Sequence, residues 1–236
     1  MQKSSWHILS TRPLPKPLVE QALQQGIVLE EVSFIETEPV IDEKLQKDLE
    51  TFSQQNMIAV FTSMNAVDAV ADAIKRKVAW TIYSIGSATQ RLVEERLGVN
   101  VKASAAYASE LADKIIADAP AEVHFFCGNI RRDVLPQKLK EAGINVVESV
   151  VYKTIETPKR VLKHFDAILF YSPSAVNSFF LVNKVDDATE LFAIGTTTAE
   201  AIQPYSNKPV IIATEPGKEE MVQQAIRHFN IKTNER

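Results

Sequence analysis

Two groups of serine and threonine side chains follow short apolar runs at corresponding places in the two halves of this chain. The segment Phe61–Val67, followed by Ile85–Thr89, returns as Phe170–Val176, followed by Ile194–Thr198. Both parts are displaced by the same 109 residues (170 − 61 and 194 − 85). Hydroxyl groups, and the free backbone N–H groups at the start of a helix, donate hydrogen bonds to anions such as carboxylates. The spacing therefore predicts an internal duplication whose two copies present anion-binding turns.

The elements that would hold these hydroxyl groups in place are buried strands that lead into helices. Each copy reads as an apolar strand, a small polar turn and an amphipathic helix, with Asn65 and Ser174 at the positions expected for N-caps. The second part of each copy repeats this order, and we expect helices to begin near Thr89 and Thr198. Ligands bind open α/β sheets beyond the carboxyl ends of the strands, so these turns form the expected binding edge.

A second repeated block has a displacement of 117 residues (124 − 7) and reads as strand, helix, glycine, strand. Under this displacement His7, Leu18, Gly26, Glu31 and Thr37 correspond to His124, Leu135, Gly143, Glu148 and Thr154. The strands after the two glycines are expected over 27–35 and 145–152, and each runs into a break marked by Pro39 or Pro158. These breaks indicate exits from a domain.

The two kinds of block alternate along the chain, which leaves two domain arrangements open. Tandem domains would pair each block that contains a long strand with the hydroxyl-bearing block that follows it. The breaks instead suggest that the two middle blocks form one continuous domain and the two outer blocks a discontinuous one, with two long strands between them. Both arrangements fit the order of the blocks.

Composition excludes several classes of function. The chain of 236 residues has a formal net charge of −4 and a pI near 5.7, which argues against general nucleic-acid binding. Its one cysteine, Cys127, cannot form an internal disulfide and fits a buried residue in the reducing cytoplasm. We expect no secretory signal and no membrane span, because no apolar run is long enough. The sequence also lacks the glycine-rich nucleotide loops, the G-x-S-x-G motif and the ligand spacings of metal sites.

Each candidate residue also has an ordinary structural explanation. Serine and threonine at the start of a helix are usually caps or turn formers. His7 and His124 stand among apolar residues on predicted strands, which favours structural over catalytic histidines. By itself, Tyr152 on the second long strand reads as a packing aromatic residue. The case for chemistry therefore depends on the combination of motifs.

Six motifs spread over most of the chain keep an order and spacing known from one family. They are Phe61-Thr-Ser-x-Asn-Ala-Val67, Ile85-Gly-x-x-Thr89, Arg132-x-x-Leu135 with Gly143, Val151-Tyr-x-Thr154, Phe170-x-Ser-Pro-Ser-Ala-Val176 and Ile194-Gly-x-Thr-Thr-Ala199. From about Ser10 to Pro216 the chain resembles the uroporphyrinogen-III synthases. The resemblance implies an α/β fold with two flavodoxin-like domains, each with a parallel sheet, joined by a two-stranded β linker. It favours the discontinuous arrangement, with an outer domain of 1–34 plus 157–236, a middle domain of 41–148, and linkers at 35–40 and 149–156.

The resemblance also implies a reaction and a set of site residues. Enzymes of this family close the linear tetrapyrrole hydroxymethylbilane into uroporphyrinogen III, inverting the last pyrrole ring and losing water, without a cofactor or metal. It implies an active site in the cleft between the domains, where Tyr152 would assist departure of the hydroxyl group. The expected substrate-binding residues are Ser63, Thr89, Ser172, Thr197 and Thr198 from the motifs, and Arg12 and Arg132 for their positive charge near strand ends.

A substrate with eight carboxylates needs many hydrogen-bond donors, which helix N-termini can supply even in an acidic protein. A non-catalytic protein whose two lobes bind an anionic small molecule would use nearly the same residues, so it remains the alternative to the enzyme. In either case we expect a cytoplasmic monomer that binds a small molecule, with no nucleic-acid or membrane partner.

Overall fold

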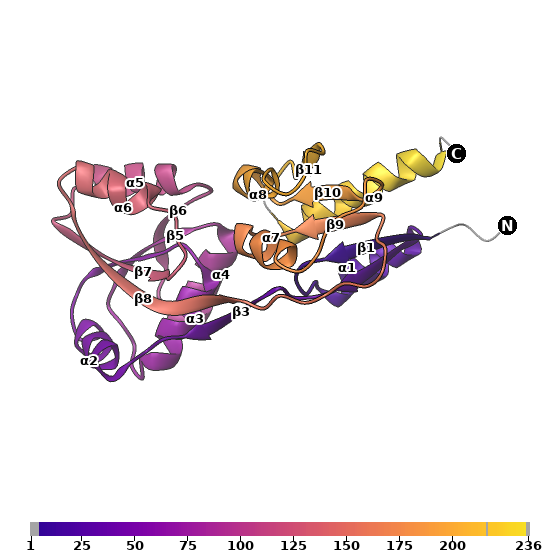
Figure 1. Ribbon diagram of the computed structural model, residues 1–236. Coiled ribbons are helices and arrows are strands. Elements are labelled where there is room, and N and C mark those ends of the chain that lie inside the picture. Colours follow the sequence, from indigo (N-terminus) through magenta and orange to yellow (C-terminus); the bar gives the residue numbers. More distant parts are fainter. Residues whose placement is uncertain (1–4, 216, 235–236) are drawn as a thin grey trace. The chain divides into compact units, whose positions relative to one another are not determined.

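The computed structural model describes residues 5–215 and 217–234, in which most strands are followed by a helix (Figure 1). The strands are β1 (Trp6–Ser10), β2 (Ile27–Glu31), β3 (Ile35–Pro39), β4 (Ile58–Phe61), β5 (Thr81–Ile85), β6 (Val101–Ala105), β7 (Glu122–Gly128), β8 (Asn145–Glu156), β9 (Ala167–Phe170), β10 (Glu190–Ala193) and β11 (Val210–Ile212). The helices are α1 (Lys16–Gln24), α2 (Glu43–Phe52), α3 (Met64–Ala73), α4 (Ser87–Leu97), α5 (Ala108–Ala117), α6 (Val134–Glu141), α7 (Pro173–Phe180), α8 (Thr196–Ile202) and α9 (Lys218–Asn234).

The chain divides into two compact units. Unit 1 consists of Met1–Glu36 and Ile155–Arg236, and unit 2 of Thr37–Thr154. The strand β1 therefore shares a sheet with β9 from the far end of the sequence, and β4 shares a sheet with β7.

Unit 1 is built on a five-stranded parallel sheet in the order β11-β10-β9-β1-β2. Neighbouring residues of a strand point to opposite faces, so each face of the sheet collects its own apolar cluster. Ile8 and its neighbours pack against α1 and α9, whereas Leu9 and its neighbours pack against α7 and α8. The continuous apolar runs of these strands follow from this burial on both faces.

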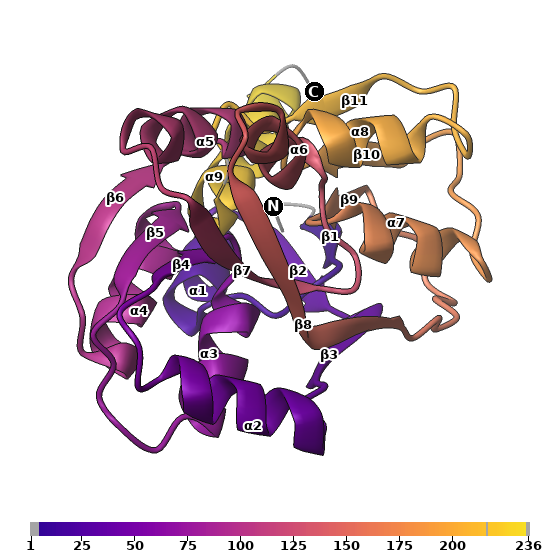
Figure 2. The same ribbon diagram turned by 90° about the vertical axis from the view of Figure 1, so that its left-hand side faces the viewer.

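Unit 2 has a six-stranded sheet in the order β3-β8-β7-β4-β5-β6, with parallel pairing from β8 to β6. Helices α2, α3 and α4 cover the face that contains Phe61, and α5 and α6 cover the face that contains Val60 (Figure 2). The predicted fold class, α/β with parallel sheets, is confirmed. The strand order of unit 1 also corresponds to β6-β5-β4-β7-β8 of unit 2 when strands are matched by the displacements of 109 and 117 residues.

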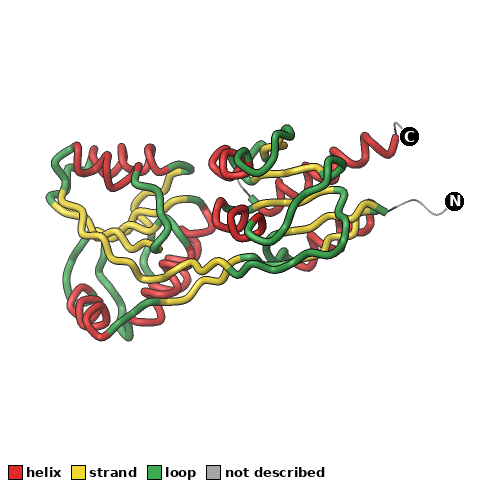
Figure 3. The backbone as a smooth tube through the Cα atoms, viewed as in Figure 1, coloured by secondary structure: helices red, strands yellow, loops and turns green. Residues whose placement is uncertain are grey.

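The two long strands differ from the prediction. The strand expected over 27–35 is broken, because β2 ends at Glu31 in one sheet and β3 begins at Ile35 in the other. Between them Phe34 is fully buried, and the Ser33 hydroxyl donates to the Ile35 carbonyl at 2.6 Å. The second strand is longer than expected, since β8 continues to Glu156, and Figure 3 shows it as one unbroken strand.

The predicted helix starts were also two residues late. The N-caps are Ser63 and Ser172, not Asn65 and Ser174, and their hydroxyl oxygens accept hydrogen bonds from the N–H groups of Asn65 at 3.2 Å and Ala175 at 3.1 Å. The physical reason is that each serine lies two residues after the end of its strand, where the backbone is still extended and the helix begins with the next residue; in α7 Pro173 then occupies the favoured first helical position. In the same way α4 and α8 begin at Ser87 and Thr196, ahead of the predicted Thr89 and Thr198.

Candidate functional site

Within each unit the candidate residues lie at the carboxyl edge of the sheet, because parallel strands all end on the same side. In unit 2, Ser63 follows β4, Thr89 follows β5, Arg132 follows β7, and Tyr152 lies near the end of β8. In unit 1, Arg12 follows β1, Ser172 follows β9, and Thr197 and Thr198 follow β10. In each sheet the chain changes direction between two central neighbours, β4 and β7 or β9 and β1, which is the switch point where open α/β sheets bind ligands.

The two capping serines can each still donate a hydrogen bond. The oxygens of Ser63 and Ser172 each accept a backbone N–H bond, but neither hydroxyl donates its hydrogen to another group in the described part of the chain. A hydroxyl can accept and donate at the same time. Each half-buried serine is therefore able to cap its helix and to donate to a carboxylate.

The three threonines lie deeper in their helices than expected. Thr89 is the third residue of α4 and only 6% exposed, and Thr198 is the third residue of α8 and 3% exposed. Thr197 is half-buried, and the N–H group of Thr198 already donates to the Gly195 carbonyl at 3.1 Å. The buried pair contributes to packing at these helix starts, and Thr197 is the more accessible of the three.

Tyr152 is packed into unit 2 at the end of the β7–β8 pair. It is 9% exposed and belongs to the apolar cluster that contains Trp80 and Phe126. Its hydroxyl has no hydrogen-bond partner between residues 5 and 215 or 217 and 234, and it is not among the fully buried polar atoms. A hydroxyl that touches solvent and has no protein partner is free to give its proton to a ligand.

Arg12 is an exposed cation at the unit 1 edge. It has no ion pair or hydrogen bond to its guanidinium from the residues described, while its backbone carbonyl accepts the Ser10 hydroxyl at 2.6 Å. Lys218, at the start of α9, fixes the same loop by donating to the Pro13 carbonyl at 2.9 Å. Although Arg12 is exposed, the surrounding protein desolvates it enough to lower its pKa, and desolvation together with the charge of Arg12 lowers the pKa of Lys218. Partial desolvation of two neighbouring cations favours binding of an anion.

Tyr171, which follows β9, differs from Tyr152 in its access to solvent. Its hydroxyl is fully buried without a partner in the described chain, and Ser10 beside it directs its own hydrogen to the Arg12 carbonyl. Burial raises the pKa of Tyr171, opposed by Ser10 and by the charge of Arg12. A hydroxyl in this position cannot reach a dissolved ligand.

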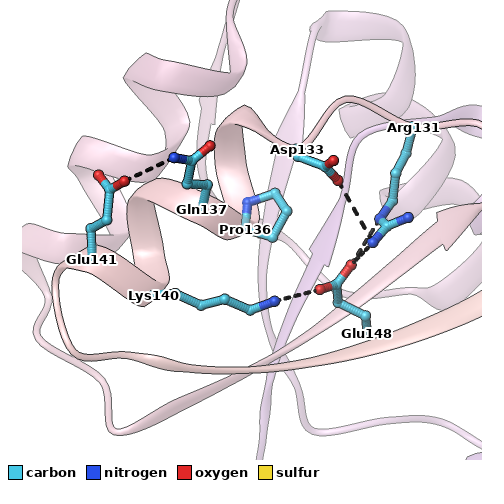
Figure 4. Close-up of a pocket in the computed structure, with 7 residues that line it drawn as sticks. All are labelled: Arg131, Asp133, Pro136, Gln137, Lys140, Glu141 and Glu148. Atoms are coloured by element: carbon cyan, nitrogen blue, oxygen red, sulfur yellow. Dashed lines mark hydrogen bonds and ion pairs between the residues drawn. The ribbon is translucent and has the colours of Figure 1, made fainter.

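Arg132 lies exposed in the loop between β7 and α6, beside a hollow whose cations are already neutralised. The hollow is lined by Arg131, Asp133, Pro136, Gln137, Lys140, Glu141 and Glu148 (Figure 4). Figure 4 shows Arg131 and Lys140 both reaching Glu148. Lys140 Nζ lies 2.8 Å from Glu148 Oε1. Burial acts to raise the pKa of Glu148, but the hydrogen bonds from Lys140 and Arg131 outweigh it and the pKa is lowered. The carboxylate of Glu148 would repel an anion here, so this hollow is a weak candidate.

Metal-ligand clusters and membrane-spanning helices are both absent from the described ranges. No group of three or more His, Cys, Asp or Glu side chains there could hold a metal ion. None of the helices found there has the length and apolar character needed to cross a membrane.

Sequence reasoning missed three residues that the structure joins to these candidates: Gly128, Asn129 and Lys218. Gly128 and Asn129 contact Tyr152, and Lys218 fixes the loop of Arg12. One signal was present, because the displacement of 117 residues makes Asn129 the counterpart of Arg12 (12 + 117).

The fold and the polar strand ends define a class of two-unit α/β proteins with parallel sheets, and comparisons identify the family within it. The family described as Uroporphyrinogen-III synthase HemD matches residues 16–223. The uroporphyrinogen-III synthase of Chlorobaculum parvum is 28% identical over 233 residues, covering 87% of this chain and 92% of that protein. That of Saccharomyces cerevisiae is 37% identical over 116 residues, covering 41% of this chain and 42% of that protein. The chain therefore belongs to the uroporphyrinogen-III synthase family, a family of cyclising lyases, and the resemblance noted in the sequence is confirmed.

Solved structures agree on the fold. The uroporphyrinogen-III synthetase of Helicobacter pylori 26695 superposes with a TM-score of 0.69 at 18% identity, covering 94% of this chain and 99% of that one. A mutant uroporphyrinogen III synthase of the extremely thermophilic bacterium Thermus thermophilus gives a TM-score of 0.65 at 16% identity, covering 97% of this chain and 100% of that one. At such low identity the likeness establishes the fold alone.

Proposed function

We propose that this chain closes hydroxymethylbilane into uroporphyrinogen III, inverting the last pyrrole ring and releasing water, as a step of tetrapyrrole and haem biosynthesis. The observation that carries the proposal is the family match over residues 16–223. It favours the enzyme over the alternative of a non-catalytic binding protein for an anionic small molecule. The reaction would need no cofactor or metal, and the protein would act as a cytoplasmic monomer.

The proposed donor for departure of the substrate hydroxyl is Tyr152. Its hydroxyl reaches solvent and has no hydrogen-bond partner among the described residues, which supports this role. A single positioned proton donor typically contributes a factor of about 10² to 10⁴ in rate. The pyrrole nitrogen of the substrate supplies the electrons that expel the hydroxyl group, and the tyrosine proton converts that group to water.

The proposed substrate-binding residues share one task, which is to hold the carboxylates of the substrate. Two observations support them. Each residue follows the carboxyl end of a strand, and the hydroxyl hydrogens of the two capping serines are not donated to any group in the described part of the chain. They are Ser63, Thr89, Ser172, Thr197, Thr198, Arg12 and Arg132. The burial of Thr89 and Thr198 favours an indirect contribution, in which each threonine shapes the helix start whose N–H groups face the ligand.

We also propose that the halves arose by internal duplication and form two domains, 1–34 with 157–236 and 41–148, linked by 35–40 and 149–156. The equal strand order of the two sheets supports the duplication, and the compact units of 1–36 with 155–236 and 37–154 support the discontinuous domains. Residues 149–154 pack in unit 2, so the second linker contributes to the core of its domain.

The experiment that tests the function is turnover of hydroxymethylbilane followed by isomer analysis of the oxidised porphyrin. Without enzyme the substrate loses its hydroxyl group and then closes with the last pyrrole ring not inverted, which gives the type I isomer. Wild-type protein is expected to give mainly type III, and heat-inactivated protein to give type I at the background rate. Binding of the substrate with only background formation of type I would support the non-catalytic alternative instead.

A further inference from the structure

The end of the β7–β8 pair holds Tyr152 by an arrangement that does more than pack a side chain. Cys127 pairs with Val150, but Gly128 pairs with Tyr152, so Val151 is an extra residue that forms a β-bulge. A bulge changes the face on which the following side chain lies. Such a feature at a strand end is suited to aiming one particular side chain.

The bulge moves Tyr152 to the opposite face of the sheet. Before it, the even-numbered residues of β8 face α6, where Val146 packs with Leu139 and Glu148 contacts Lys140. Regular alternation would place Tyr152 on that same face. It instead joins Val151 in the apolar cluster on the other face.

Gly128 leaves the space that the ring of Tyr152 occupies. A Cβ atom built on Gly128 would lie 2.6 Å from Cζ and 2.8 Å from Oη of Tyr152, closer than van der Waals contact allows. Only a residue without a side chain therefore permits the observed position of the ring and its hydroxyl.

Asn129 fixes the backbone of β8 from Tyr152 to Thr154. Its N–H group donates to the Tyr152 carbonyl at 3.1 Å, and its side-chain Oδ1 accepts the N–H of Thr154 at 2.8 Å. Its Nδ2 group lies 3.5 Å from the Thr154 carbonyl. The exposed Asn129 side chain therefore contacts both backbone polar groups of Thr154, two positions beyond Tyr152. In this way it acts as a clamp on the strand.

We infer that Gly128 and Asn129 are positioning residues, which hold the Tyr152 hydroxyl at the place where it gives its proton to the leaving group. The inference rests on the proposed function. The bulge sets the face, Gly128 sets the depth of the ring, and Asn129 prevents the strand from shifting. Misplacement of a reacting group by about 1 Å can cost a factor of about 10² in rate, so all three devices are expected to affect kcat more than KM.

The kinetic test compares five single variants, Tyr152→Phe among them, and one double variant. Gly128→Ala is expected to lower kcat about 10- to 100-fold and Asn129→Ala about 10-fold, with KM within about twofold of wild type. Asn129→Asp keeps the acceptor for the Thr154 N–H and is expected to retain kcat within about threefold of wild type. The matched control is Asn145→Ala, which removes another exposed amide on the same strand pair, bonded to Glu122 at the amino end, and should leave kcat unchanged.

In the double variant Gly128→Ala/Tyr152→Phe the glycine substitution should cause no further loss of kcat beyond that of Tyr152→Phe. A full additional loss would show that Gly128 acts on the reaction by another route and would overturn the inference. A wild-type rate of turnover in Asn129→Ala, together with slow turnover in Tyr152→Phe, would also overturn the inference.

A second readout does not depend on activity. In protein labelled with 3-fluorotyrosine, the ¹⁹F resonance that disappears in Tyr152→Phe belongs to Tyr152. That resonance should shift or broaden in Gly128→Ala and Asn129→Ala, but not in Asn145→Ala or Asn129→Asp. An unchanged resonance in both of the first two variants overturns the positioning role, even if wild-type protein forms no type III product and the proposed function itself has failed.

Discussion

The carboxyl edges of the two sheets have the same strand order but different chemistry. The displacement of 117 residues pairs Arg12 with Asn129 and Ser10 with Cys127. After β1 the chain presents a guanidinium with no partner in the described residues, whereas after β7 it presents an amide that is bonded to the backbone of Thr154. At this one position the scaffold thus carries a cation in unit 1 and a backbone clamp in unit 2.

This difference indicates a division of tasks. A partly desolvated cation that has no ion pair among the described residues suits the binding of carboxylates, because its charge is not already neutralised by them. A clamped strand suits the aiming of one hydroxyl, because a proton donor acts only at hydrogen-bond distance from the group that leaves.

The largest effect is expected from the two tyrosines. Tyr152→Phe should lower kcat by about 10²-fold, since it removes the proposed donor, while type III remains the main product of the enzymatic reaction. Tyr171→Phe should leave kcat within about twofold and stabilise the protein by up to about 1 kcal/mol, because it removes a buried hydroxyl without a partner. Steady-state kinetics with isomer analysis and urea unfolding measure both. Equal rate losses in the two variants would contradict the division of tasks.

The second prediction concerns Cys127, whose counterpart Ser10 does not titrate. Burial raises the pKa of the Cys127 thiol from its ordinary value of 9.0 to about 11, opposed by the charge of Arg131. Between these values the unfolded chain binds fewer protons than the folded one, so the free energy of unfolding falls as pH rises. The contribution is fully present below pH 9 and should be lost by about pH 11, at about 1.4 kcal/mol for each pH unit.

The measurement is urea unfolding of wild type and Cys127→Ala at several pH values. Other groups titrate in this range in both proteins, so the quantity to follow is the difference between them. The free energy of unfolding of wild type, relative to that of Cys127→Ala, should fall by about 2 to 3 kcal/mol between pH 8.5 and 11. A constant difference would mean that the thiol ionises as easily in the folded chain as in the unfolded one.

The third prediction concerns Arg12, the cation that follows β1. Arg12→Ala should raise KM about tenfold, because it removes one charge-assisted hydrogen bond to the substrate. We expect kcat to stay within about twofold of wild type. Arg12→Lys should recover only part of the binding, because an ammonium group cannot bind a carboxylate in two parallel bonds. The control is Arg160→Ala, which removes an exposed cation from the loop that precedes β9. An equal rise of KM in this control would point to net charge instead of a site.

The sequence predicted the fold well because the relevant signals are local or repeated. Apolar runs indicated the strands, the glycines Gly26 and Gly143 marked helix ends with positive φ, and two displacements related the halves. The N-caps were placed two residues late because Ser63 and Asn65 are both good caps, and only the end of β4 decides between them. The roles of Gly128 and Asn129 could not be predicted, since a bulge and a steric contact with Tyr152 depend on pairing between strands.

The smallest effect is expected where the two units are most alike, at the serine caps. Ser63→Ala and Ser172→Ala each leave one N–H group at a helix start without its acceptor, and each should lower the free energy of unfolding by about 1 kcal/mol. Ser63→Asp and Ser172→Asp keep an acceptor and add a negative charge near the positive end of the helix, so they should retain most of the stability. The aspartates should nevertheless weaken substrate binding, because they replace a hydroxyl donor by a group that repels carboxylates. Urea unfolding and KM together separate the two functions of each serine. If alanine raises KM and aspartate does not, the serines contribute to binding only by shaping the helix start, and the carboxylates are held by the backbone.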